Sequence, residues 1–240
     1  MPVVAERATA DEMVEAQSTV GPGRLHYNFA KGRRRGTVVL GHGAGGGIET
    51  IDLVALSLSL PLRGYEVVRV EQPWRVAGRK VAPRPEVLDR AWLDLLRGEE
   101  FLEGRHRHLV LGGRSAGARV AARTASVLHA HGVVALAFPL HPPGKPERSR
   151  QDELPKNLPT LVIQGERDAF GRPHEFVATG ETLDLAVVPA ADHSFAVGRA
   201  APITQDEVGE LISDYVCEWL VHDRLALSSK SGESASGQGR

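Results

Sequence analysis

Three residues whose types could carry out acyl transfer follow one another along the chain as serine, aspartate and histidine. Ser115 is the serine of a G-x-S-x-G pattern, Asp168 ends a GERD segment, and His193 lies in a DHSF segment. A serine hydroxyl is a weak nucleophile until a base takes its proton, and an imidazole is the usual base near neutral pH. The imidazole in turn needs a carboxylate to fix its tautomer, which Asp168 or the neighbouring Glu166 could supply. These residue types predict hydrolysis through a covalent acyl-enzyme.

The residues on either side of Ser115 predict how the chain presents its hydroxyl. An apolar run at 109–111 leads into the pattern, and an alanine-rich helical pattern follows the serine. This order predicts a strand, a one-residue corner and a helix, with the serine backbone strained at the corner. A side chain at Gly113 or Gly117 would collide with the neighbouring strand or helix. The N–H groups after the serine would then lie at a helix N-terminus.

The alternation of strand and helix patterns extends over most of the chain. Apolar and β-branched runs predict strands, and apolar residues repeated at helical spacing predict helices. Strands are expected at 25–29, 37–40, 65–70, 109–111, 132–138, 160–164 and 183–188. Helices are expected at 49–60, from 85, at 116–131, at 173–179 and from a capping box at 204–207. We therefore predict an α/β fold with one doubly wound, mostly parallel sheet and helices on both of its faces.

The sequence predicts one domain at 23–224, preceded by a loose N-terminal arm at 1–22 and followed by a disordered tail at 225–240. In folds of this class the chemistry lies at the carboxyl ends of the strands, where the serine, the aspartate and the histidine all fall. The connection at 139–159 is short and rich in proline, which argues against a long helix there. We therefore expect a minimal lid or none, and an open site.

The composition narrows the classes of function. The chain has 240 residues, of which 42% are hydrophobic and 25% charged, and its formal net charge is −1. No overall field therefore draws it to nucleic acid or to a membrane. The single cysteine, Cys217, excludes an internal disulfide and a multi-cysteine metal site. With no bilayer-length apolar run and no secretory signal, we expect a cytoplasmic protein that uses neither cofactor nor metal.

Four motifs taken in order, HGAGG, GGRSAG, GERD and DHSF, resemble those of the alpha/beta-hydrolase superfamily, in particular its small dienelactone-hydrolase-like branch. The resemblance covers about residues 24–221. It implies that Ser115 is the nucleophile, that His193 is the general base and acid, and that Asp168 is the carboxylate that orients the imidazole.

The resemblance also implies an oxyanion hole built from backbone N–H groups. One donor would be Ala116, and the other would be Ala44, with Gly45 as the alternative. Dienelactone hydrolases proper carry a cysteine nucleophile, and this chain has Ser115 at that position. Acyl transfer is therefore implied, but lactone cleavage is not.

Several residues beside these motifs are candidates for binding the substrate. They are His42, Gly43, Gly45, Arg114, His141 and Lys145. Loops expected at the same edge of the sheet carry the cationic residues Arg75, Arg79, Lys80, His141 and Lys145. Cations gathered at the mouth of a site attract anions, so we expect a small acyl substrate with a negative charge near the scissile bond. The alternative is that these side chains only face solvent.

Two other classes of function compete with hydrolysis. The glycine-rich loop at 41–46 also fits G-x-G-x-x-G after a strand, and Glu71 ends the next strand, where it could hold a ribose hydroxyl. That combination predicts an NAD(P)-dependent oxidoreductase, but it leaves the other three motifs unexplained. The remaining alternative is a catalytically silent hydrolase fold that serves as a binding module.

Overall fold

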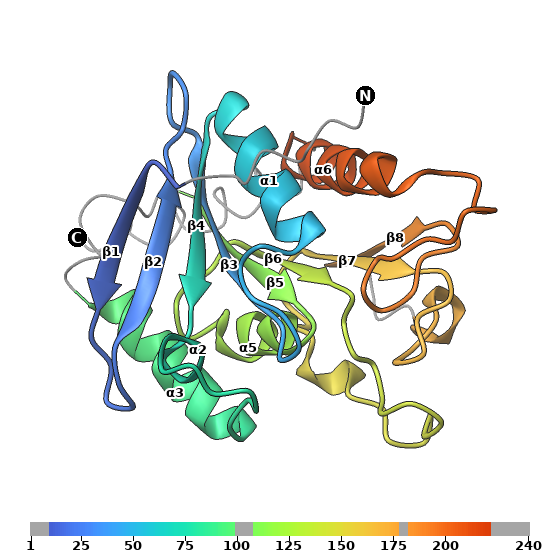
Figure 1. The fold of residues 1–240 in the computed structure, drawn as a ribbon, viewed down its shortest axis with the longest axis horizontal. Coiled ribbons are helices and arrows are strands. Elements are labelled where there is room, and N and C mark those ends of the chain that lie inside the picture. The colour runs from blue at the N-terminus through green and yellow to red at the C-terminus, as the bar shows by residue number, and fades with distance from the viewer. Residues whose placement is uncertain (1–9, 99–107, 178–181, 222–240) are drawn as a thin grey trace, which may run out of the picture.

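The computed structural model describes residues 10–98, 108–177 and 182–221. Within these ranges eight strands form one sheet in the order β1-β2-β4-β3-β5-β6-β7-β8 (Figure 1). They are β1 (Glu12–Ala16), β2 (Gly23–Asn28), β3 (Gly36–Gly41), β4 (Tyr65–Glu71), β5 (Leu109–Arg114), β6 (Gly132–Leu136), β7 (Thr160–Gly165) and β8 (Leu183–Val188). The pairs β1–β2 and β2–β4 are antiparallel, and all the remaining pairs are parallel.

Alternate residues of the central strands pack into two separate hydrophobic cores. In β3, Val38 and Leu40 belong to one core and Val39 to the other, and all three side chains are fully buried. Successive side chains of a strand point to opposite faces, so a wholly apolar strand needs cover on both faces. The apolar runs of the sequence therefore form the centre of the sheet.

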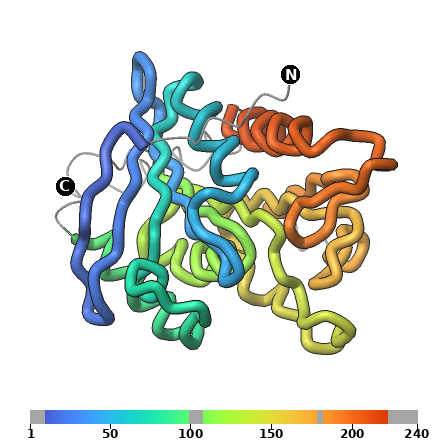
Figure 2. Tube along the Cα trace, in the orientation of Figure 1, coloured from blue at the N-terminus to red at the C-terminus, as the bar shows by residue number. Residues whose placement is uncertain are grey.

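Helices cover the two faces of the sheet (Figure 1 and Figure 2). One face carries α1 (Ile51–Leu62) and α6 (Gln205–Val221), and the other carries α2 (Pro73–Val76), α3 (Pro85–Arg97) and α5 (Ala116–Thr124). Helix α6 begins with the predicted capping box, in which Thr204 Oγ1 accepts the Glu207 N–H and Glu207 Oε2 accepts the Thr204 N–H. None of the described helices is long and apolar enough to cross a membrane.

The predicted fold class is confirmed, and one part of the predicted domain boundaries is wrong. The loose arm expected at 1–22 contains strand β1, which pairs with β2 at the edge of the sheet. Only Ala16 of β1 is buried and Val14 is half-buried, so the strand carries little apolar signal and is held by backbone hydrogen bonds. Residues 1–9 and the predicted tail at 225–240 lie outside the described residues.

Two predicted helices are shorter than expected, and the predicted lack of a lid is confirmed. Helix α5 ends at Thr124, after which the chain turns and His129 adopts a left-handed φ of 52°. At 173–179 the described residues form only a 3₁₀ turn, Pro173–Glu175. The connection at 139–159 likewise contains a single 3₁₀ turn, Gln151–Glu153, and no longer helix. No helical cap therefore rises from this described connection.

Candidate active site

Ser115 occupies a sharp corner between β5 and α5. Its φ of 52° and ψ of −110° are strained for a residue with a side chain. A Cβ added to Gly113 or Gly117 would fall on the backbone of Gly41 in the neighbouring strand β3. The Ser115 N–H donates to the carbonyl oxygen of Leu136 in β6 at 2.9 Å, which fixes the corner to the sheet. The predicted strained corner is confirmed, as is the need for its two glycines.

Ser115, His193 and Asp168 form a continuous chain of hydrogen bonds. Ser115 Oγ lies 2.9 Å from His193 Nε2, and His193 Nδ1 lies 2.8 Å from Asp168 Oδ2. An ionised carboxylate can only accept, so Nδ1 carries the proton and Nε2 is the acceptor for the serine hydroxyl. This is the tautomer that a general base requires. The Asp168 side chain is fully buried, whereas that of His193 is 20% exposed, so of these two groups the imidazole alone meets solvent.

Hydrogen bonds from three groups hold the Asp168 carboxylate at the end of β7. Oδ2 accepts from Gln164 Nε2 at 2.9 Å as well as from His193, and Oδ1 accepts the Phe170 N–H at 2.8 Å. Gln164 is itself fully buried. The alternative carboxylate, Glu166, is exposed and accepts a backbone N–H after β8 instead. Of the two carboxylates considered, the structure brings Asp168 to the histidine.

Contacts on three sides hold the loop that carries His193. Arg114 Nη2 donates to the His193 carbonyl oxygen at 2.8 Å, and its guanidinium carbon lies 5.9 Å from the centre of the Phe195 ring. The Phe170 ring packs on the imidazole with the ring centroids 4.2 Å apart. A Cβ at Gly165 would come within 2.6 Å of a carbonyl oxygen of this loop, so the glycine permits the loop to approach β7 closely. The imidazole orientation is thus set by backbone, cation and ring together.

The two predicted oxyanion-hole residues, Ala44 and Ala116, line one small cavity beside Ser115. Ala116 is the first residue of α5, where the backbone N–H groups have no partner within the helix. A Cβ added to Gly43 would lie 3.4 Å from Ser115 Cβ, so the glycine-rich loop passes directly beside the serine. Gly45 does not line this cavity. The arrangement favours Ala44 over Gly45 as the second donor.

The sequence matches one protein family over most of its length. A family profile described as "Alpha/beta hydrolase domain" covers residues 34–221. The chain belongs to the alpha/beta hydrolase family. This confirms the family that the four motifs predicted. No curated protein matches the sequence.

Solved structures share the fold of this alpha/beta hydrolase at low sequence identity. An alpha-beta serine hydrolase homologue from Coxiella burnetii is 19% identical, with a TM-score of 0.69 over 86% of this chain and 98% of that one. A serine hydrolase without a lid from Xanthomonas campestris is 18% identical, with a TM-score of 0.64 over 89% and 97%. An esterase from Thermogutta terrifontis is 19% identical, with a TM-score of 0.60 over 87% and 98%. At such identities the likeness concerns the fold.

His42, which we expected to bind substrate, is bonded to backbone at both ring nitrogens. Nε2 accepts the Gln72 N–H at 3.2 Å, and Nδ1 donates to the Gly43 carbonyl oxygen at 2.9 Å. Only 5% of the residue is exposed, and this burial lowers the pKa of His42 despite the bond to the Gly43 carbonyl. In this hydrolase His42 is a neutral ring that ties the glycine-rich loop to the end of β4, and no ring nitrogen is left for a substrate.

His141 is likewise bonded at both ring nitrogens. Nδ1 lies 2.9 Å from the Pro142 carbonyl oxygen and Nε2 lies 2.9 Å from Glu175 Oε2. Burial acts to lower the pKa of His141, but the Pro142 carbonyl and the Glu175 carboxylate outweigh it and raise the pKa above its usual value. A protonated ring donates to both partners. His141 therefore holds its own loop in place. Because both of its ring nitrogens are already bonded, we do not assign it to substrate binding.

The other predicted cations lie in different surroundings. Arg79 lines a cavity at the carboxyl end of β4. Arg75, Lys80 and Lys145 are exposed, as Arg79 is, but within the described chain they line neither this cavity nor the small one beside Ser115. Only part of the predicted cationic cluster is thus brought to a concave surface.

The dinucleotide alternative lacks the geometry that its fingerprint requires. In that site the glycine-rich loop opens a helix directly, so that the helix N-terminus meets the pyrophosphate. Here α1 begins only at Ile51, well beyond the last glycine of the fingerprint. Glu71, the expected ribose partner, lies 3.4 Å from Arg24 and 3.6 Å from His26. Neither half of a dinucleotide site is formed.

Two residues of the site were missed from the sequence, Gln164 and Phe170. A polar residue at the end of an otherwise apolar strand, just before GERD, was the one available signal for Gln164. Phe170 gave no signal, because its contact with His193 depends on two loops that follow different strands.

Proposed function

We propose that this protein is a serine hydrolase that cleaves a carboxylic ester or thioester of a small acyl substrate through an acyl-enzyme. The observation that carries the proposal is the chain of hydrogen bonds from Ser115 Oγ through His193 to the buried Asp168. Membership of the alpha/beta hydrolase family agrees with it, and similar structures are named as serine hydrolases and esterases.

In the first half-reaction Ser115 Oγ attacks the carbonyl carbon of the substrate. His193 Nε2 takes the hydroxyl proton as the new C–O bond forms, and the Asp168 carboxylate stabilises the imidazolium. The former carbonyl oxygen, now negative, accepts hydrogen bonds from the backbone N–H groups of Ala44 and Ala116. When the tetrahedral intermediate collapses, the alcohol or thiol leaves with the proton from His193, and the acyl group stays on the serine.

In the second half-reaction water replaces the alcohol. His193 takes a proton from the water, whose oxygen attacks the acyl carbon, and the same proton then passes to Ser115 Oγ as it leaves. The products are a carboxylic acid and an alcohol or thiol. The partial exposure of His193 and the lack of a helical cap in the described connection at 139–159 support entry of this water.

Labelling with a fluorophosphonate probe, followed by peptide mapping, tests the proposal. The wild-type protein should be labelled on Ser115, and Ser115→Ala should not be labelled. The same variant should lower kcat on p-nitrophenyl acetate by roughly 10³-fold or more, with an unchanged melting temperature. Ser126→Ala, at an exposed serine after α5, serves as the matched control and should keep both signals. A wild-type protein that resists the probe while a control hydrolase is labelled would favour the silent binding module.

A further inference from the structure

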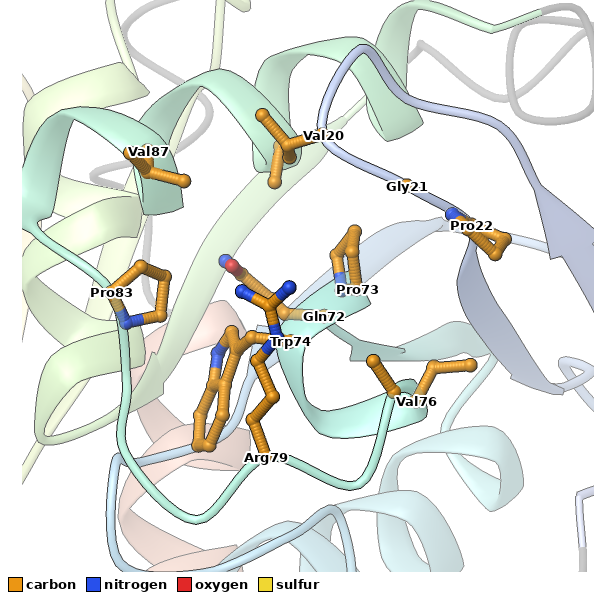
Figure 3. Close-up of a pocket in the computed structure, with 12 residues that line it drawn as sticks. Val20, Gly21, Pro22, Gln72, Pro73, Trp74, Val76, Arg79, Pro83 and Val87 are labelled. Atoms are coloured by element: carbon orange, nitrogen blue, oxygen red, sulfur yellow. The ribbon is translucent and has the colours of Figure 1, made fainter.

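A second cavity, of about 610 Å³, opens at the carboxyl end of β4 (Figure 3). Its walls come from the loop between β1 and β2, from the connection between β4 and α3, and from α3 itself. Most of the lining is apolar and includes Val20, Pro73, Val76, Pro83 and Val87. Val20 is 42% exposed and Val87 37% exposed, so the apolar surface is open to a ligand. A concave wall of this kind suits a hydrocarbon segment.

One cation interrupts the apolar lining. Figure 3 shows the Arg79 side chain extending from its loop among Gln72, Pro73 and Trp74. Arg79 forms no ion pair with any residue of the described chain. A guanidinium group binds a carboxylate through two parallel hydrogen bonds, and Arg79 is exposed where it lines the cavity, so a carboxylate can reach it. The cavity thus fits a molecule with an apolar body and one carboxylate.

The second cavity adjoins the small cavity beside Ser115. Both are lined by Gln72 and Trp74, and the small one reaches Ala44 and Ala116. The Trp74 ring lies against the His42 ring with the centroids 5.5 Å apart, so it forms a partition next to the glycine-rich loop. An acyl chain that reaches the larger cavity from the reacting carbonyl would have to run past this ring, because the small cavity itself has a volume of only about 10 Å³.

The spacing of the strands sets the length of such a ligand. The larger cavity lies at the end of β4 and Ser115 follows β5, and these strands are separated by β3 alone. Two strand spacings amount to about 10 Å, roughly the length of eight bonds of an extended chain. A short acyl group would not reach the Arg79 cavity, whereas a medium-length one would.

We propose that the larger cavity binds the acyl arm of the substrate, an apolar chain of about eight carbons that ends in a carboxylate paired with Arg79. The substrate class is therefore an ω-carboxyacyl ester or thioester. This inference rests on the proposed hydrolase function and adds to it the identity of the acyl group.

Hydrolysis of matched methyl esters tests the inference. Monomethyl suberate and methyl octanoate share an eight-carbon acyl chain and differ in the terminal carboxylate, and monomethyl succinate carries the carboxylate on a short chain. The kcat/KM for the suberate ester should exceed that for the octanoate ester by roughly ten-fold at low salt. Monomethyl succinate should gain nothing over methyl butyrate, because its carboxylate cannot reach Arg79.

Two neighbouring cations supply the variant and its control. Arg79→Gln should abolish the preference for suberate over octanoate. Lys80→Gln removes the same charge from the next position, which is also exposed but does not line the cavity, and should retain the preference. Val87→Trp, which fills the cavity, should lower kcat/KM for the suberate ester relative to that for p-nitrophenyl acetate. Equal losses in Arg79→Gln and Lys80→Gln would overturn the inference in favour of a diffuse field.

Binding provides a readout that does not depend on turnover. Isothermal titration calorimetry of Ser115→Ala with monomethyl suberate should show binding at least about ten-fold tighter than with methyl octanoate, and Ser115→Ala with Arg79→Gln should lose that difference. If p-nitrophenyl acetate is cleaved through Ser115 but the two long esters react and bind equally, the inference fails and the proposed function stands. If no ester is cleaved yet the calorimetric difference remains, the proposed function fails and the cavity still binds the carboxylate.

Discussion

Histidines stand on both sides of Ser115, and the groups bonded to their rings differ between the two sides. On the β3–β4 side, His42 is bonded to two backbone groups and burial lowers its pKa. On the other side, His141 follows β6 and His193 follows β8, and each is bonded to a carboxylate. All three follow strands at the same edge of the sheet, so position alone does not separate them.

The difference shows which of these rings has the partners that a proton-transferring base requires. His42 has no ring nitrogen that is free of backbone. His141 has a carboxylate partner, but its other nitrogen lies against the Pro142 carbonyl oxygen. His193 alone among these three combines a carboxylate at Nδ1 with a hydroxyl at Nε2. A general base therefore requires a carboxylate at one ring nitrogen and a hydroxyl at the other. The partners of His42 and His141 only hold those two rings in place.

The largest effect should come from the carboxylate behind His193. Asp168→Asn should lower kcat on p-nitrophenyl acetate by roughly 10⁴-fold, because the amide would donate to the ring and stabilise the wrong tautomer. Glu166→Gln, two residues away and exposed, should change kcat by about two-fold at most. The reverse ranking would transfer the carboxylate role to Glu166.

A smaller loss should follow from releasing the His193 loop. Arg114→Gln removes the bond to the His193 carbonyl oxygen and should lower kcat by roughly ten- to a hundred-fold, with KM little changed. The fully buried Asp52 lies 3.8 Å from Arg114 and would lose its cation, so the single variant should also be less stable. Adding Asp52→Asn should recover the melting temperature but not kcat. Recovery of both would mean that Arg114 acts only through stability.

On the opposite side, replacing His42 should affect stability more than chemistry. His42→Phe leaves the Gln72 N–H and the Gly43 carbonyl oxygen without their partner, and should lower the free energy of unfolding by about 1–3 kcal/mol. Its kcat should fall far less than in Asp168→Asn. Denaturant unfolding measures the first effect, with the exposed His174→Gln as control. A loss of kcat as large as that of Asp168→Asn would give His42 a direct part in catalysis.

The smallest effect, and the sharpest contrast, is the pH dependence of stability. The pKa of His42 is lower in the folded protein than in the unfolded chain. As pH falls below about 6.5, the unfolded chain therefore takes up a proton on His42 before the folded protein does, and the contribution of His42 to the free energy of unfolding is lost. His141 has a raised pKa, so its contribution is present below about pH 6.5 and is lost as pH rises through that raised pKa. Unfolding free energies of His42→Phe and His141→Phe, each subtracted from wild type across this range, should slope in opposite directions. Slopes of the same sign would contradict the assigned partners.

The sequence pattern was sufficient for the parts of the site that each depend on one strand and the loop after it. Ser115, Asp168 and His193 each follow an apolar run, and parallel strands bring those ends to one edge, so the three could be placed together. The partners of His42 and His141 could not be predicted, because the Gln72 N–H and the Glu175 carboxylate come from other segments of the chain. The sequence shows a histidine after a strand in each case, and tertiary packing decides which ring nitrogen remains accessible.

Prediction of the fold failed where an element is held mainly by backbone pairing. The strand around Val38 and Val39 can be predicted from its run of apolar residues. In β1, by contrast, three of the five residues are exposed and only one is buried. Helix α5 was predicted too long because its alanines continue the helical pattern up to Ala125, past which the backbone turns at His129. Helix propensity does not predict such a turn, because tertiary contacts determine where it occurs.

The antiparallel β1–β2 pair also has a consequence for how this protein could be altered. The loop between these strands supplies Val20 to the larger cavity, yet neither strand carries an atom of the Ser115–His193–Asp168 chain. Edge hairpins tolerate changes in length and sequence better than central strands. Libraries randomised in this hairpin could therefore be screened for new chain-length selectivity while the proposed catalytic residues stay unchanged, which makes the hairpin a natural starting point for directed evolution.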